Sequence, residues 1–141
     1  IETVKKLNWA PDIIHVHGWL ASLLPLYLKE YYKDEPLFNE SKIVTSLYNQ
    51  SFDDSLNKEM INKIKFDNIE ESAIKTLETP TYNNLMKVAV DYSDALIIGS
   101  ENMPDELQDY LKNCNKPVLE YQYPDEFAEA YTAFYNTQVL S

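Results

Sequence analysis

The stretch DIIHVHGWLASLLPLYLKEYY, from Asp12 to Tyr32, places a strand-like run directly before a helix-like run. Ile13–His17 is short, continuous and rich in β-branched residues, which is typical of a strand buried on both faces of a sheet. The apolar stripe that follows has helical spacing, and Pro25 within it is expected to kink the helix. The junction holds the only two histidines of the chain, one of its two glycines and one of its two tryptophans. It is therefore the first candidate for a functional site.

Strand-like and helix-like segments alternate along the rest of the chain. We expect further strands at residues 42–48, 94–100 and 116–122, and helices within residues 1–8, 20–31, 56–64, 82–89, 104–111 and 127–135. This alternation predicts an α/β fold, a doubly wound and mostly parallel sheet flanked by helices, as a single domain over residues 1–141. Such sheets bind ligands beyond the carboxyl ends of their strands. His17 lies at one such end, and Gly99 lies at another.

The composition excludes several classes of protein. A chain of 141 residues with 45% hydrophobic residues is long enough to bury a core as one domain. The formal net charge of −11 makes neither nucleic acid nor an anionic membrane an expected partner, and no apolar run could span a bilayer. The single cysteine, Cys114, favours a reducing compartment, so we expect a cytoplasmic location. Because the chain begins at Ile1 rather than Met, we interpret it as part of a longer protein.

His15 and His17 point to the same face of their strand because side chains alternate along a strand. Two histidines can hold a metal, but a site needs three or four ligands and the spacing marks no third, so we expect no metal. We expect His15 to pack in the core through a hydrogen bond and His17 to lie at the rim. The isolated glycines provide neither a phosphate-binding loop nor a serine elbow, so the residues alone assign no cofactor and no catalytic group.

Aromatic residues make up 13% of the chain, and eleven of them are tyrosines. Tyrosine and tryptophan faces suit sugar rings, although core packing would explain most of them equally well. The residues expected to bind a substrate at the strand ends are His17, Gly18, Trp19, Tyr48 and Ser100. For Trp19 two interpretations stay open: a platform for a sugar, or a ring buried under the helix that touches no ligand.

Two segments resemble the N-terminal domain of bacterial glycogen synthases and plant starch synthases. PDIIHVHGWLASLLPLYLKEYY (residues 11–32) is similar to the family's strand and helix, with the matching residues Asp12, His15, His17, Trp19, Leu24, Pro25, Tyr27 and Leu28. LMKVAVDYSDALIIGSENMPDEL (residues 85–107) resembles a second family segment, with the matching residues Lys87, Tyr92, Asp94 and Glu106. KIVTSLYNQSF (residues 42–52) is a weaker match. The resemblance covers residues 11–111.

The resemblance implies a GT-B fold, in which two doubly wound domains face each other across a cleft. It also implies transfer of glucose from ADP-glucose to an α-1,4-glucan, with the acceptor glucan held mainly by the N-terminal domain. An α-glucan is therefore an expected partner, and ADP-glucose is expected only with a second domain. The chain departs from the family where Gly18 replaces an aspartate and Leu20 replaces a histidine that contacts the transferred glucose. A further family histidine is lost near Leu47 or Tyr48, so we assign no catalytic residue.

The function is left with three hypotheses. The chain is part of a glycogen or starch synthase-like glucosyltransferase that is inactive alone, a non-catalytic regulatory module that binds glucan or a protein, or a generic α/β domain related only by fold. The first strands of the family's domain would precede Ile1. We therefore also expect an exposed sheet edge and a homo-oligomer formed through it.

Overall fold

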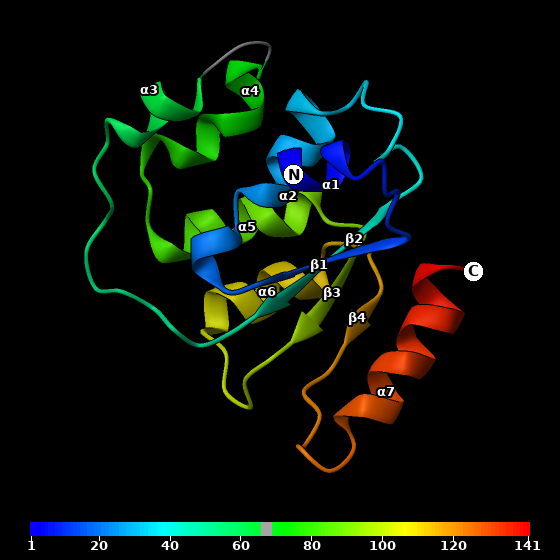
Figure 1. Cartoon of the computed structure of the whole chain (residues 1–141). Helices are drawn as coiled ribbons and strands as arrows, with labels where there is room; N and C mark the ends of the chain where they lie inside the picture. Colours follow the sequence, from blue (N-terminus) through cyan, green and yellow to red (C-terminus); the bar gives the residue numbers. More distant parts are fainter. Residues whose placement is uncertain (66–68) are drawn as a thin grey trace.

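The computed structural model of the protein describes residues 1–65 and 69–141. Its centre is a sheet of parallel strands in the order β1-β2-β3-β4, with the bounds Ile13–His17, Lys42–Leu47, Ala95–Ile98 and Val118–Leu119 (Figure 1). The register places His17 beside Ser46, and Leu47 beside Ile98. The carboxyl ends of neighbouring strands therefore lie together at one edge of the sheet, which confirms the predicted parallel α/β fold.

Helices connect the strands and cover the sheet. The α-helices are α1 (Glu2–Lys6), α2 (Leu24–Leu26), α3 (Met60–Ile64), α4 (Glu71–Ile74), α5 (Tyr82–Tyr92), α6 (Asp105–Lys112) and α7 (Phe127–Phe134). Short 3-10 or π turns form η1 (Trp19–Ala21), η2 (Tyr27–Tyr31), η3 (Lys75–Glu78) and η4 (Tyr135–Val139). Each strand is added on the same side of the previous one, and right-handed crossovers then place the connecting helices on one face. The helix α7 follows the last strand and packs on the other face (Figure 1).

Apolar side chains hold both faces of the sheet. On the face of the connecting helices, leucines of the strands and helices interlock, among them Leu26, Leu47, Leu85, Leu96 and Leu107. On the opposite face the smaller cluster consists of Val44, Ala95, Ile97, Phe134 and Val139. The strand residues of the two clusters alternate along β2 and β3, as the period of two requires. One face thus depends on several helices, and the other depends on α7 and η4.

The end of α5 is held by a lysine that precedes the last strand of the sheet. Lys116 Nζ donates hydrogen bonds of 2.6–2.7 Å to the backbone carbonyls of Val90, Asp91 and Ser93. The last carbonyls of a helix lack partners within the helix, so a lysine that reaches them satisfies these groups and complements the helix dipole. This contact fixes α5 against the start of β4.

The strand β1 has its predicted bounds, but the prediction that it is buried on both faces is wrong. It is the edge strand of the sheet, and of its residues only Val16 is fully buried. His15 is half-buried on the face of the sheet that α7 covers, while His17 is exposed. Because β1 is an edge strand and α7 covers this face only in part, its polar side chains stay within reach of solvent.

The predicted helix at residues 20–31 is not continuous. A 3-10 turn, a short α-helix and a π turn replace it, because Pro25 lacks the N–H that a helix interior needs and instead lies in the first turn of α2. Leu20, the first residue of the predicted stripe, is 83% exposed. The helix predicted at residues 56–64 begins only at Met60, and the strand predicted at 116–122 contains two paired residues.

Candidate active site

The carboxyl ends of the four strands border one pocket of about 350 Å³. Its lining consists of His17, Tyr48, Ile98, Gly99, Tyr121, Gln122, Pro124, Phe127 and Tyr131. The first four residues belong to the ends of β1, β2 and β3, and the others belong to the segment after β4. The pocket therefore lies where an open parallel sheet binds its ligand.

His15 lies behind two lining residues, His17 and Tyr131, and its two ring nitrogens both take part in hydrogen bonds. Nε2 lies 2.7 Å from Ser46 Oγ, and Nδ1 lies 2.6 Å from the hydroxyl of Tyr135. A neutral imidazole has one donor and one acceptor, and each hydroxyl can take either part. Burial, followed by the repulsion of nearby His17, lowers the pKa of His15 from 6.5 to about 4. The predicted hydrogen bonding of His15 and the rim position of His17 agree with the structure, but the predicted core position of His15 is wrong because its side chain is only half-buried.

Tyr48 is held in place at the rim. Its hydroxyl lies 3.0 Å from Nδ1 of His17, and its backbone carbonyl accepts a hydrogen bond from the hydroxyl of Tyr82. The ring passes close over Gly99, because a Cβ at position 99 would lie 2.5–2.9 Å from three atoms of the ring. The structure therefore brings together the predicted residues His17 and Tyr48, and it adds Gly99 beneath them.

Gly18 and Ser100 shape the loops beside the pocket without lining it. Gly18 has a φ of 70°, a backbone conformation that residues with a Cβ rarely adopt, and its N–H donates to the carbonyl of Ser46 at 3.3 Å. Ser100 Oγ accepts a hydrogen bond of 3.0 Å from the N–H of Asn49. This bond ties the loop after β2 to the loop after β3. Binding of a substrate by either residue stays a prediction.

Trp19 packs against the core. Its ring meets the ring of Phe52 edge-on at 5.1 Å between centroids, and Phe52 in turn meets Tyr82 at 5.9 Å. The Trp19 side chain is half-buried beside the main apolar cluster and is absent from the described lining of the pocket. This geometry favours the structural interpretation of Trp19, and its contact with a ligand stays a prediction.

Sequence reasoning missed the wall of the pocket that comes from the C-terminal segment. Tyr121, Phe127 and Tyr131 line it, although they lie 70 or more residues from Tyr48 in the sequence. Burial raises the pKa of Tyr131 and of Tyr135, and Tyr48 is close enough to contribute to both shifts. The high tyrosine content of the chain was the available signal, but nothing in the spacing indicated which tyrosines would meet.

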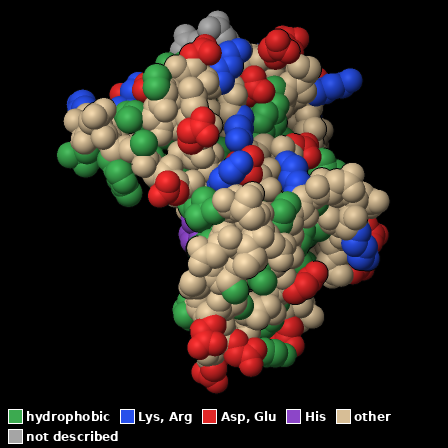
Figure 2. All heavy atoms as spheres, turned by 90° about the vertical axis from the view of Figure 1, so that its right-hand side faces the viewer, with side chains coloured by type: hydrophobic (Ala, Val, Ile, Leu, Met, Phe, Trp, Pro, Cys, Tyr) green, Lys and Arg blue, Asp and Glu red, His purple; other side chains and the backbone are tan. Residues whose placement is uncertain are grey.

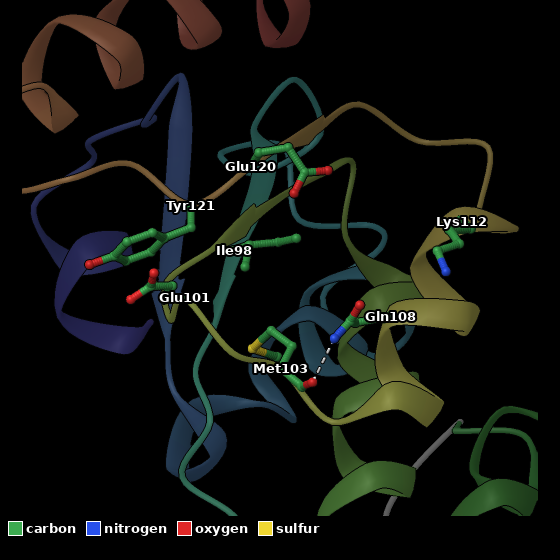
Figure 3. Close-up of a pocket in the computed structure, with 7 residues that line it drawn as sticks. All are labelled: Ile98, Glu101, Met103, Gln108, Lys112, Glu120 and Tyr121. Carbon is green, nitrogen blue, oxygen red and sulfur yellow. Dashed lines mark hydrogen bonds between the residues drawn. The ribbon is translucent and has the colours of Figure 1, made fainter.

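A smaller pocket of about 150 Å³ adjoins this one and shares Ile98 and Tyr121 with it (Figure 3). Its charged lining residues are Glu101, Lys112 and Glu120. Figure 3 shows Glu101 beside Tyr121 and Lys112 on the opposite side of Ile98, and Tyr121 lines both pockets. The two pockets therefore suit ligands of different chemistry.

The surface of the molecule is acidic, in keeping with the net charge of −11. Figure 2, which views the molecule from the side of α7, shows acidic side chains gathered at the lower end of this face. Among the residues that the structure describes, no group of three or more histidine, cysteine, aspartate or glutamate side chains could hold a metal ion. Within residues 1–65 and 69–141, no helix has the length and apolar character needed to cross a bilayer.

These observations define a class: a parallel α/β domain with a pocket at the carboxyl ends of its strands, where such sheets bind ligands. The sequence matches the family model of the starch synthase catalytic domain over residues 1–116, so the chain belongs to this family. The match includes β1, β2 and β3 and ends before β4 and α7. The predicted family is thereby confirmed, and relation by fold alone is excluded.

Curated relatives support the same family. The glycogen synthase of Clostridium perfringens is 30% identical over 108 residues, which are 77% of this chain and 22% of that protein. The glycogen synthase of Chlorobium luteolum is 32% identical over 115 residues, which are 81% of this chain and 23% of that protein. The chain thus spans less than a quarter of the length of these relatives. No solved structure matches the chain.

The second motif that carries the family resemblance has a structural role. Asp94 accepts a hydrogen bond of 2.7 Å from the N–H of Ile43 and pairs with Lys29 at 3.0 Å. Lys87 pairs with Glu106 and joins α5 to α6. The Asp94 contacts fix η2 and β2 at the start of β3, and the Lys87 pair joins two helices. Both motifs nevertheless border the pocket, the first through His17 and the second through Ile98 and Gly99.

Proposed function

We propose that this chain forms the acceptor side of a glucosyltransferase of the glycogen and starch synthase type, and that its pocket binds an α-1,4-glucan. The observation that carries the proposal is the tyrosine-walled pocket at the strand ends of a chain that belongs to this family. Aromatic faces stack on the apolar C–H faces of sugar rings, and phenol, imidazole and amide groups bind their hydroxyls. The lining combines both kinds of group.

An NMR titration of the 141-residue chain with maltoheptaose tests the proposal. We expect millimolar sugar to move the backbone resonances of His17, Tyr48 and Gly99, with smaller shifts at Gly18 and Ser100. Cellobiose, a β-linked glucose disaccharide, serves as the control ligand and should produce weaker shifts. Maltoheptaose that moves no resonance around the pocket would contradict the proposal.

We further propose that the chain alone transfers no glucose from ADP-glucose. In the family the position of Leu20 holds a histidine that contacts the transferred glucose, and a leucine side chain, 83% exposed here, can neither donate a hydrogen bond nor stabilise developing charge. Incubation with radiolabelled ADP-glucose and glycogen measures this directly. Incorporation of label above a heat-killed control would show that the reasoning about Leu20 is wrong.

A non-catalytic module that binds glucan or a protein is the second candidate, and the loss of the histidine at Leu20 favours it. The two candidates differ in what a complete protein would contain. A glucosyltransferase needs a second α/β domain that holds ADP-glucose and supplies a lysine, an arginine and a glutamate to the site. The sequence of the full gene distinguishes them, because a gene without such a domain supports the non-catalytic module.

We also propose that copies of the chain associate through the outer edge of β1. In the described part of the chain this edge has no strand partner, and Trp9, which precedes β1, is 59% exposed. Sedimentation at micromolar concentration tests the association. A stable monomer of 16.4 kDa would contradict it.

A cytoplasmic location in a bacterial cell is a further proposal. It is supported by a single cysteine, Cys114, without a disulfide, and by relatives that come from bacteria. Fractionation of cells that carry the gene, followed by immunodetection, tests it. Recovery of the protein outside the cytoplasmic fraction would refute this location.

A further inference from the structure

We propose that Tyr48 selects the ligand of the pocket by offering its ring to one neutral hexose unit, and that Gly99 is the positioning residue for that ring. This inference rests on the proposed function, because it names the part of an α-glucan that the pocket takes. It concerns a tyrosine that stands near a position where the family has a histidine. It also concerns a pocket wall that lies outside the family match.

Contacts hold the Tyr48 ring in one place. Its hydroxyl contacts His17, its backbone carbonyl accepts from Tyr82, and its ring lies against Gly99. A Cβ at position 99 would lie 2.5, 2.8 and 2.9 Å from ring atoms Cε1, Cδ1 and Cζ. Distances under about 3 Å are sterically forbidden, so any side chain at position 99 would push the ring away. The glycine at this strand end therefore makes room for the tyrosine ring.

The charge of the lining selects a neutral ligand. In the lining that the structure describes, no aspartate, glutamate, lysine or arginine takes part, and His17 is the one histidine. The phenol of Tyr131 is uncharged at neutral pH, and burial raises its pKa further. By contrast, the lining of the adjoining pocket contains the charged residues Glu101, Lys112 and Glu120 (Figure 3). A hexose fits the uncharged pocket better than a sugar phosphate does.

The pocket has room for a hexose unit against the single ring of Tyr48. A volume of about 350 Å³ corresponds to roughly a dozen waters at about 30 Å³ each. A hexose unit has about that number of non-hydrogen atoms, and bonded atoms pack more closely than waters, so the unit fits. Tyr121 and Tyr131 line the pocket beside the strand ends, and the pocket is open to solvent, so the rest of a glucan would extend outside. We therefore expect maltotriose and maltoheptaose to bind with similar affinity.

Substitutions at the two positions test the inference, with maltotriose as the probe and NMR titration as the measurement. Tyr48→Phe keeps the ring and should bind within about twofold of the wild type. Tyr48→Leu removes the aromatic face and should weaken binding about five- to tenfold, which is within the range that an aromatic contact contributes. Tyr123→Leu is the matched control, because Tyr123 is 58% exposed and is absent from the described lining.

Gly99→Ala should weaken binding as much as Tyr48→Leu, because it displaces the ring. In the double variant with Tyr48→Leu, the alanine should have no further effect, since it acts through a ring that is no longer there. Urea unfolding of each variant checks that it is folded at the titration temperature. If Gly99→Ala does not fold, Tyr48→Leu and its control still decide the matter.

The failures of the two proposals differ. A wild type that binds no maltooligosaccharide overturns both this inference and the proposed function. A wild type that binds while Tyr48→Leu binds equally well, or while Tyr123→Leu is weakened to the same extent, overturns this inference alone. Tighter binding of glucose 1-phosphate than of maltotriose, or a clear gain of affinity from maltotriose to maltoheptaose, also overturns it.

Discussion

Protonation of His15 should destabilise the fold. Its ring contacts Ser46 and Tyr135 by hydrogen bonds and faces the rings of His17 and Tyr131. Burial lowers its pKa from 6.5 to about 4, so the folded protein favours the neutral ring. The unfolded chain takes up a proton at this histidine below about pH 6.5. The stabilising contribution is therefore complete above pH 6.5 and is lost as the pH falls toward 4.

The magnitude follows from the change in pKa. A fall from 6.5 to about 4 corresponds to at most about 3.4 kcal/mol, at 1.36 kcal/mol for each pH unit. Between pH 7 and pH 5 the linkage relation gives a loss of about 2 kcal/mol. Because the ring is half-buried and solvent screens its charge, we expect about 1 kcal/mol of this to be observed.

Urea unfolding at pH 7, 6 and 5 measures this loss. His15→Gln removes the titrating group, so the difference between the wild type and the variant isolates its contribution. The carboxylates of Glu71 and Glu106, whose pKa values are lowered by hydrogen bonds from Lys65 and Lys87, stay ionised in this range. Wild type and variant that lose stability in parallel from pH 7 to pH 5 would refute the reasoning.

Further substitutions test the packing, each by urea unfolding. Phe134→Ala should lower the free energy of unfolding by about 3 kcal/mol, because the buried Phe134 side chain packs α7 against the sheet. Phe127→Ala should lower it by less than about 1 kcal/mol, because Phe127 is exposed. Equal losses would contradict the packing of α7 through Phe134. Lys116→Met should cost about 1–3 kcal/mol by removing the bonds to the end of α5, while Lys112→Met, an exposed pair with Asp109, should leave stability unchanged. Trp19→Phe should cost about 1–2 kcal/mol, and a variant as stable as the wild type would argue against the packing role of Trp19.

The strands could be predicted from local sequence because buried parallel strands consist of short apolar, β-branched runs. The bounds of β1 agree with the prediction, and those of β2 and β3 differ by a few residues. The broken helix around Pro25 could be predicted only in part, since the proline indicated a break but not the 3-10 and π turns that replace it. Exposure of Leu20 depends on where the chain turns after Gly18, which helical periodicity does not describe.

The side of the pocket formed by the strand ends could be predicted from the sequence, and the opposite wall could not. Alternation along β1 and the shared edge of parallel strands are enough to bring His17 and Tyr48 together. The opposite wall required the position of α7, which depends on tertiary packing of Phe134 on the sheet rather than on local sequence. The contact of Tyr48 with Gly99 is likewise a matter of a few tenths of an ångström between two strand ends. Sequence patterns locate such residues on an edge but do not give their distances.

A crystal structure of the chain with maltotriose would show where the sugar lies. We predict that one glucose unit lies in the pocket against the ring of Tyr48, between the strand ends and Tyr131, while the other two units extend into solvent. Maltotriose bound against Trp19 instead, or bound only outside the pocket, would show that the pocket is not the glucan site.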